Sequence, residues 1–185
     1  MSNDFKDLRI IHYPDPRLRQ VCQPVTAFDD GLRALVERMY ELMETGEGVG
    51  LAASQVGINQ RLFVYNPTGK PEDKRAFVNP VLRDLHGSVE AEEGCLSLPG
   101  INVQVRRAQQ AHLIAQDLQG NPVELPLEDL PARVCQHEID HLNGVLIIDR
   151  MGPSDRLATR KTLKALEDQF KSSAKRPRSA ARAPR

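Results

Sequence analysis

Apolar residues recur at helical spacing in three parts of the chain. After Asp29 and Asp30, either of which is a plausible N-cap, they occupy positions i, i+3, i+4 and i+7 until Gly46 and Gly48 end the pattern. This first predicted helix packs against the core through Leu32, Leu35, Val36, Met39, Leu42 and Met43. A second helix is predicted from residue 129, with a proline in its first turn, and a third after residue 153, with an apolar stripe of Leu163, Leu166 and Phe170.

Short runs that alternate or are rich in β-branched residues predict strands between these helices. Turn-forming residues bound five such runs, at residues 61–65, 76–82, 101–105, 111–115 and 123–127. The run with Ile101, Val103 and Val105 has the clearest period of two. Residues 146–148 predict one more short strand. The chain therefore mixes helices with strands, and it shows no internal repeat.

Length and composition indicate one soluble globular domain. The chain has 185 residues, of which 40% are hydrophobic, and it lacks an apolar run near the roughly 18 residues that a membrane span needs. The first residues lack a basic flank followed by an apolar segment, so we expect a cytoplasmic protein. Three cysteines at irregular spacing do not suggest a disulfide framework, and we expect reduced thiols.

The formal net charge is zero, but the charge is distributed unevenly. Residues 171–185 contain no acid and six basic residues, Lys171, Lys175, Arg176, Arg178, Arg182 and Arg185. We therefore expect one folded domain over residues 1–170 and a basic, disordered tail over residues 171–185.

A metal-binding pattern lies within the second predicted helix, at residues 137–141. On a helix each residue advances about 100°, so His137 and His141 return to the same face and can reach one ion. Glu138 lies beside them and can contact a water there without being a ligand. This His-Glu-X-X-His pattern is typical of metal hydrolases, in which the glutamate moves protons. Gly144 is expected to end the helix.

Two histidines are too few for a catalytic site, which normally has three protein ligands and an open position. Cys135 lies about 160° from His137 around the helix and cannot share its ion. Cys22 has no other site-like residue nearby. Cys95 lies in a turn-rich segment, residues 92–100, directly after a glycine. Another glycine-rich segment, residues 48–57, matches no phosphate-binding loop, so a plain turn is its simplest interpretation.

Three of these segments together resemble the peptide deformylase family. They are residues 48–55, 93–97 and 136–141, and residues 14–19 and 143–146 are also similar to the family. The likeness spans roughly residues 8–150, in the family's order and spacing. It implies an enzyme that removes the formyl group from the N-terminal formyl-methionine of new polypeptides and releases formate. It also implies an α+β fold, with small antiparallel sheets around the metal-binding helix and a C-terminal helix.

The resemblance implies that Cys95, His137 and His141 bind one divalent ion, with water as the fourth ligand. The family suggests Fe²⁺, although Zn²⁺, Ni²⁺ or Co²⁺ suits the same ligands. In the expected mechanism, the metal-bound water attacks the formyl carbon while Glu138 acts as general base and then as general acid.

The family pattern also implies two donors to the oxyanion, the side-chain amide of Gln55 and the backbone N–H of Leu96. Gly50 is expected to have a backbone role against the substrate or the wall of the site. Gln136 and Asp140 are expected either to support the ligands or to lie on the helix face, and Asp140 is equally well explained as a surface charge.

The substrate is expected to occupy an apolar pocket and to pair with a strand. The pocket for the methionine side chain is predicted to be walled by Ile139, Val134 and Leu98. The strand from Ile101 is predicted to pair with the extended peptide backbone. The partners are thus formyl-methionine polypeptides, with no membrane or DNA partner. The basic tail is either a solvated end or a contact with ribosomal RNA.

Two other functions remain open from the sequence. A zinc endopeptidase shares the His-Glu-X-X-His pattern but normally takes its third ligand downstream, where the acids are Asp149, Asp155, Glu167 and Asp168. A binding module with a structural metal would need a fourth protein ligand, and no such ligand is evident.

Overall fold

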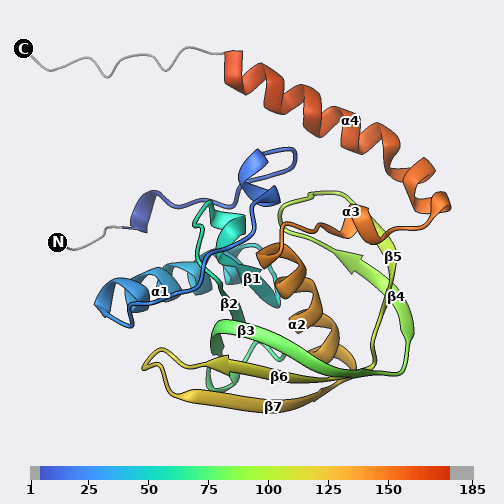
Figure 1. Cartoon of the computed structure of the whole chain (residues 1–185). Coiled ribbons are helices and arrows are strands. Elements are labelled where there is room, and N and C mark those ends of the chain that lie inside the picture. Colours follow the sequence, from blue (N-terminus) through green and yellow to red (C-terminus); the bar gives the residue numbers. More distant parts are fainter. Residues whose placement is uncertain (1–4, 176–185) are drawn as a thin grey trace, which may run out of the picture.

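The larger sheet has five antiparallel strands in the order β1-β2-β3-β6-β7, with β3, β6 and β7 at the bottom of Figure 1 and β1 and β2 above them. The structure is a computed structural model that describes residues 5–175. All of the strand runs at residues 61–65, 76–82, 111–115 and 123–127 lie in this sheet. The strands are β1 (Gly50–Ala52), β2 (Leu62–Tyr65), β3 (Arg75–His86), β6 (Gln110–Gln116) and β7 (Pro122–Glu128).

A separate two-stranded sheet pairs β4 (Val89–Gly94) with β5 (Asn102–Arg107). In β5 the residues alternate between exposed and buried, as the period of two predicted, and Val103 and Val105 face the core. The sequence did not predict β4, because its acidic residues are poor strand formers. Cross-strand pairing with β5, including an ion pair between Glu90 and Arg106, accompanies its extended conformation.

Helix α2 (Asp129–Leu142) lies between the two sheets and carries the metal-binding pattern (Figure 1). One face packs on the five-stranded sheet, where Cys135, Ile139 and Leu142 join Phe63 and Phe77 in a core cluster. Gly144 follows the helix with a left-handed φ of +73°, and its N–H donates to the His141 carbonyl. The prediction that this glycine ends the helix is therefore confirmed.

Helix α1 (Asp30–Thr45) begins where the sequence placed an N-cap. Asp29 is the cap, because its carboxylate accepts the Leu32 N–H at 3.0 Å. The apolar stripe packs on the opposite side of β1 and β2 from the metal-binding helix, in a second core cluster. The buried residues of the helix are Leu32, Leu35, Val36, Met39, Tyr40 and Met43.

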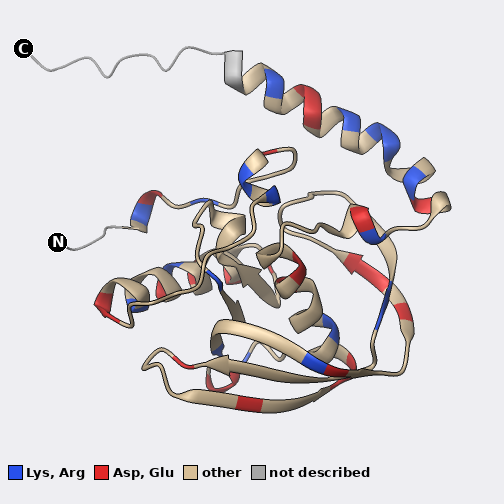
Figure 2. Cartoon of the chain, viewed as in Figure 1, with Lys and Arg blue, Asp and Glu red and all other residues tan. Residues whose placement is uncertain are grey.

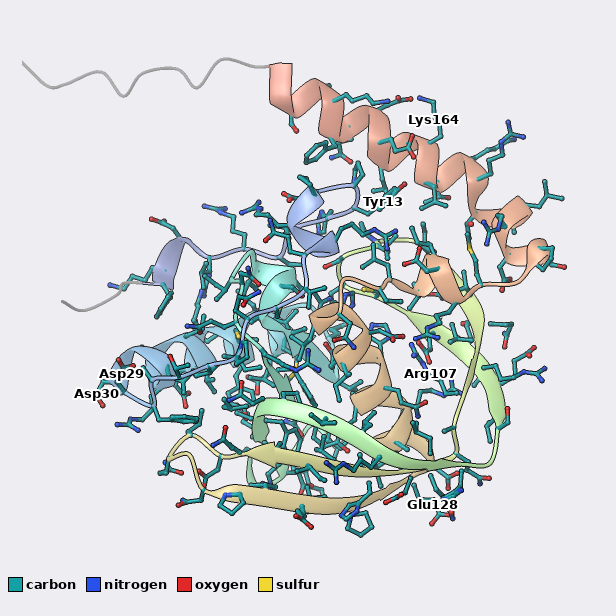
Figure 3. The ribbon with its side chains drawn as sticks, viewed as in Figure 1. Tyr13, Asp29, Asp30, Arg107, Glu128 and Lys164 are labelled. Atoms are coloured by element: carbon teal, nitrogen blue, oxygen red, sulfur yellow. The ribbon has the colours of Figure 1, made fainter. Side chains whose placement is uncertain are left out.

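Two helices follow the metal-binding helix. The strand predicted at residues 146–148 was wrong, since Ile147–Arg150 forms the short helix α3. The Asp149 carboxylate accepts the Leu146 N–H at 2.7 Å, and this local bond turns the chain into a helix despite its β-branched residues. Helix α4 (Pro153–Lys175) then crosses the surface, held by a hydrogen bond from the Tyr13 hydroxyl to Glu167 at 3.0 Å (Figure 3).

The mixture of antiparallel sheets and helices confirms the expected α+β class, including the C-terminal helix. The boundary predicted at residue 170 lies within helix α4, which continues to residue 175. Residues 176–185 of the predicted tail lie outside the described part. Among residues 5–175, no helix has both the length and the apolar character needed to span a bilayer.

Candidate metal centre and active site

The structure brings Cys95, His137 and His141 together as a possible metal site. One ligand atom from each residue lies within 4.8 Å of the others. The Cys95 sulfur is 3.3 Å from Nε2 of His141. The two rings are 5.0 Å apart between centroids, as their spacing of four residues on one helix predicted. One sulfur and two imidazole nitrogens are a donor set that suits a divalent transition metal.

The three side chains come from two elements that meet at this point. Helix α2 presents both histidines, and Cys95 follows directly after β4. A turn closes behind the cysteine, where the Leu98 N–H donates to the Cys95 carbonyl at 2.9 Å. Cys135 lies fully buried in the core and is not part of the cluster, as its position on the helix predicted.

Glu138 lies beside the cluster and is almost completely buried, with 3% of its surface exposed. Its Oε2 atom has no hydrogen-bond partner, and the residue lines the cavity next to the cluster. Burial is the main cause that raises the pKa of Glu138, to about 7. An unpartnered carboxylate oxygen beside three ligand atoms fits a site that holds an ion and a water.

Gly50 packs directly against this glutamate. A Cβ atom at Gly50 would come within 2.5 Å of Oε1 of Glu138. The position therefore admits no side chain without moving the carboxylate. The glycine-rich segment is not a plain turn, because it forms the edge strand β1 and then a 3-10 helix at Ala53–Val56, and β1 places Gly50 at the wall of the site.

Gln55 is oriented by bonds on both sides of its amide. Its Oε1 accepts the Ala52 N–H at 2.8 Å, and its Nε2 donates to the Ser97 hydroxyl at 3.2 Å. The same nitrogen lies 3.6 Å from the Cys95 sulfur. The amide nitrogen is thus directed toward the metal ligands. Leu96, the neighbour of Cys95, lines the same cavity.

Glu93 supports His137, a role that sequence analysis did not assign. Its carboxylate lies 2.9 Å from Nδ1 of His137 and accepts bonds from Arg107 and Arg133. Arg107 in turn bonds Asp140, and Figure 3 shows it between helix α2 and the smaller sheet. A metal-bound histidine usually donates its second ring N–H to an oxygen atom. A search for such a partner among the acids next to Cys95 could have identified Glu93.

The surroundings of the two histidines lower the pKa of both Glu93 and His141. Burial alone would raise the pKa of Glu93, but hydrogen bonds from His137 and Arg107 outweigh it and hold that pKa far below its ordinary value. Burial, aided by the positive charge of His137 and Arg107, lowers the pKa of His141 well below its ordinary value. A neutral His141 is ready to bind a metal without losing a proton.

The two neighbours of the ligands on helix α2 have structural contacts. Asp140 is buried and bonds Arg107 and Arg150, so it is not a surface charge. Gln136 donates to the Ala108 carbonyl and accepts the Ala108 N–H, which fixes the helix to the loop before β6. Neither side chain has a hydrogen bond to a metal-ligand histidine among the described contacts.

A cavity of about 400 Å³ opens beside two of the three possible ligands, Cys95 and His137. Apolar wall residues are Val49, Leu96, Leu130 and Val134. Of the three pocket residues predicted from the sequence, only Val134 lines it. Ile139 lies two residues after His137, so its side chain points about 200° away around the helix and packs in the core against the five-stranded sheet. Leu98 is buried in a third core cluster.

The cavity runs between two strand edges, but not the edge that the sequence predicted. Residues before and within β1 line one side, and the end of β4 with the loop after it lines the other. Neither Ile101 nor any residue of β5 lines the cavity, because β4 lies between β5 and the open space.

The downstream acids that an endopeptidase would need are engaged elsewhere. Asp149 pairs with Arg19, and Asp155 accepts the Gln104 N–H. Glu167 and Asp168, on helix α4, bond Tyr13 and Lys164. Among the described residues, none of these acids belongs to the cluster that could hold a metal.

Comparison with known proteins identifies relatives over most of the chain. The family model described as polypeptide deformylase matches residues 7–157. The peptide deformylase of Chromobacterium violaceum is 41% identical over 162 residues, which cover 88% of this chain and 97% of that protein. The peptide deformylase of Thermotoga maritima is 49% identical over 156 residues, which cover 84% of this chain and 93% of that protein.

Solved structures share the fold as well as the sequence. A peptide deformylase from Plasmodium falciparum superposes with a TM-score of 0.88 at 37% identity, covering 91% of this chain and all of that one. One from Legionella pneumophila gives a TM-score of 0.81 at 41% identity, covering 92% and 99% of the two chains. The chain therefore belongs to the polypeptide deformylase family, the hydrolases that remove the N-formyl group from newly made polypeptides.

Proposed function

We propose that this deformylase binds one divalent metal ion through Cys95, His137 and His141, and that Fe²⁺ is the ion it uses. The observation that carries the proposal is the convergence of three ligand atoms beside a buried, unpartnered Glu138 carboxylate oxygen. Zn²⁺, Ni²⁺ and Co²⁺ suit the same donors. When bound, such an ion lowers the pKa of a coordinated water from 15.7 towards about 7 and so supplies a nucleophile near neutral pH.

Glu138 is the proposed general base and acid. A pKa of about 7 lets its carboxylate accept a proton from the attacking water and return it to the leaving amine at neutral pH. Gly50 leaves space for the carboxylate, which a side chain at that position would displace.

Gln55 and Leu96 are the proposed donors to the oxyanion that forms when water adds to the formyl carbon. The Ala52 N–H holds Oε1 of Gln55, so the amide nitrogen is the end that faces the Cys95 side of the cavity. The N–H of Leu96 belongs to the residue directly after the cysteine ligand. Losing one such donor typically costs about 10²–10³ in turnover.

The cavity accommodates the formylated methionine and the start of the peptide. The apolar side chains of Val49, Leu130 and Val134 suit an unbranched thioether side chain. The edges of β1 and β4 lie on opposite sides of the cavity, and an extended peptide can bond to exposed strand edges. The substrate backbone is therefore proposed to lie between these edges.

The test is formate release from a formyl-methionine peptide by anaerobically purified protein reconstituted with Fe²⁺. The controls are the metal-free protein and the Glu138→Ala variant, each checked for its fold by circular dichroism. Rapid release that both controls abolish supports the proposed metal and base together. An unimpaired Glu138→Ala variant would exclude the proposed base, and release by metal-free protein would exclude the metal.

We also propose that residues 171–185 bring the enzyme to ribosomal RNA in the cytoplasm, where formylated chains emerge. The support is their charge, six basic residues and no acid, on the end of helix α4, which carries further lysines and arginines (Figure 2). Deletion of residues 171–185 should abolish a salt-sensitive affinity for ribosomes. Unchanged affinity of the truncated protein would contradict the proposal.

A further inference from the structure

Arg133 connects the metal-binding helix to both strands of the smaller sheet. It lies on helix α2 four residues before His137, and only 12% of its side chain is exposed. Its guanidinium donates to the Val89 carbonyl of β4 at 2.7 Å and to the Val105 carbonyl of β5 at 2.9 Å. A planar fork of donors can satisfy several acceptors in this way, whereas a lysine ammonium cannot reproduce the geometry.

The same guanidinium holds the carboxylate that supports a metal ligand. Nη1 of Arg133 donates to Oε1 of Glu93 at 2.7 Å, while Oε2 of Glu93 lies 2.9 Å from Nδ1 of His137. Arg107 bonds both carboxylate oxygens and so fixes the plane of the carboxylate. Arg133 bonds only the oxygen that faces away from His137. Together with Arg107 it holds the carboxylate in place, and the carboxylate in turn orients the imidazole ring.

The hydrogen bonds from Arg133 to β4 and β5 also affect the position of Cys95, the third proposed ligand. Cys95 follows directly after β4, whereas the two histidines lie on helix α2. The position of the sulfur relative to the imidazoles therefore depends on how β4 is seated against the helix. Arg133 makes bonds from the helix to the first residue of β4, to its partner strand and to Glu93 near its end.

Arg133 also lines the cavity beside the possible metal ligands. Arg133 lines the cavity together with Leu130, Val134 and His137, which share one face of the helix. Because Glu93 and the two carbonyls engage the guanidinium, the methylenes are the part left to contact an apolar side chain. An arginine can thus form part of an apolar wall.

We infer that Arg133 is a positioning residue with two separable parts. The guanidinium sets the geometry of Glu93, His137 and Cys95 for the metal, and the methylene stem forms part of the wall that contacts the first side chain of the substrate. This inference rests on the proposed function for the identity of the ligands and of the substrate cavity.

Three substitutions separate the two parts. Arg133→Met keeps an apolar stem and removes the guanidinium, so its dissociation constant for Ni²⁺ should rise about 10- to 100-fold while KM for a formyl-methionine tripeptide stays close to that of the unchanged protein. Arg133→Ala removes both parts, and its KM should also rise about fourfold for each methylene group that the substrate can no longer touch. Arg133→Lys keeps the stem and the charge but should bind Ni²⁺ more weakly than the unchanged protein.

Ni²⁺ affinity is measured by competition with a chelator, and KM by formate release from each variant saturated with Ni²⁺. The matched control is Arg106→Met, which removes an exposed arginine of β5 that pairs with Glu90 and does not line the cavity. It should leave both quantities unchanged. Ni²⁺ affinity that is unaltered in folded Arg133→Met would overturn the role of the guanidinium, and equal KM values for the Met and Ala variants would overturn the role of the stem.

Thermal unfolding monitors whether each variant is folded. If Arg133→Met does not fold, Arg133→Lys tests the guanidinium alone, and an unchanged Ni²⁺ affinity in that variant would contradict the inference. The Ni²⁺ measurement requires no turnover. A failure of the unchanged protein to release formate would therefore count against the proposed function and leave the comparison of Ni²⁺ affinities intact.

Discussion

Replacing Gly50 with alanine tests whether the position of Glu138 controls the rate. The added Cβ would lie 2.5 Å from Oε1 of Glu138, 2.9 Å from Cδ and 3.0 Å from Cγ. Ordinary contact begins at 3.4 Å, so the carboxylate oxygen has to move by roughly 0.9 Å. A displacement of about 1 Å at a catalytic group can cost about 10²-fold in rate. We expect the kcat of Gly50→Ala to fall by about that factor.

The loss should arise from Glu138 and not from the metal ligands. The contacts of the new Cβ are with Glu138, and Gly50 does not have a left-handed φ, so alanine adds no backbone strain there. The variant should therefore bind Ni²⁺ as tightly as the unchanged protein. Formate release under saturating peptide gives kcat, and chelator competition gives the metal affinity.

Gly152→Ala is the matched control, because a Cβ at Gly152 meets no heavy atom within 4 Å. It should retain full activity. A folded Gly50→Ala variant with more than half the kcat of the unchanged protein would refute the argument, since the glutamate would then tolerate the displacement. A loss of Ni²⁺ affinity equal to the loss of kcat would also refute it, because the effect would then lie in the ligands.

Three further predictions follow from the site and its surroundings. Gln55→Leu removes the proposed amide donor, and kcat should fall about 10²–10³-fold while Ni²⁺ affinity is retained; an unchanged kcat would exclude the donor role. The base must be ionised to accept a proton, so log(kcat/KM) should rise by about one per pH unit below the Glu138 pKa of about 7 and level off above it; a profile without this limb would contradict the assignment. Gly144→Ala forces a side chain into a φ of +73° and to within 2.5 Å of the Arg19 carbonyl oxygen, so the free energy of unfolding, measured in urea, should fall by roughly 1–3 kcal/mol or more, and an unchanged urea midpoint would show that the turn relaxes freely.

The sequence correctly predicted those parts of the fold that depend on interactions between residues close together in the chain. The N-cap at Asp29, the alternation in β5 and the left-handed turn at Gly144 each depend on residues close together in the sequence. The strand predicted at residues 146–148 failed because one side-chain bond from Asp149 outweighed the β-branched composition. The acidic strand β4 was missed because its conformation depends on pairing with β5, which no local pattern contains.

The residues of the candidate site likewise fall into those that local spacing predicts and those that it does not. Spacing alone placed His137 and His141 on one face, but the resemblance to a family supplied Cys95, since no pattern within the helix points to a residue on another element. Glu93, Arg107 and Arg133 were given no role because their charges are paired only in the folded protein. The error at Ile139 was avoidable, because helical geometry turns that side chain away from the ligands.

Because the proposed metal ligands lie on separate elements, metal binding would be a measure of complete folding. Helix α2 alone supplies two ligand atoms, whereas the third lies 46 residues from His141 on a segment seated by the smaller sheet. An isolated helix would therefore hold an ion weakly, and full affinity should develop only after that sheet has docked. Metal uptake during refolding would then follow the slowest step of assembly, so a bound ion would distinguish finished molecules from partly folded ones.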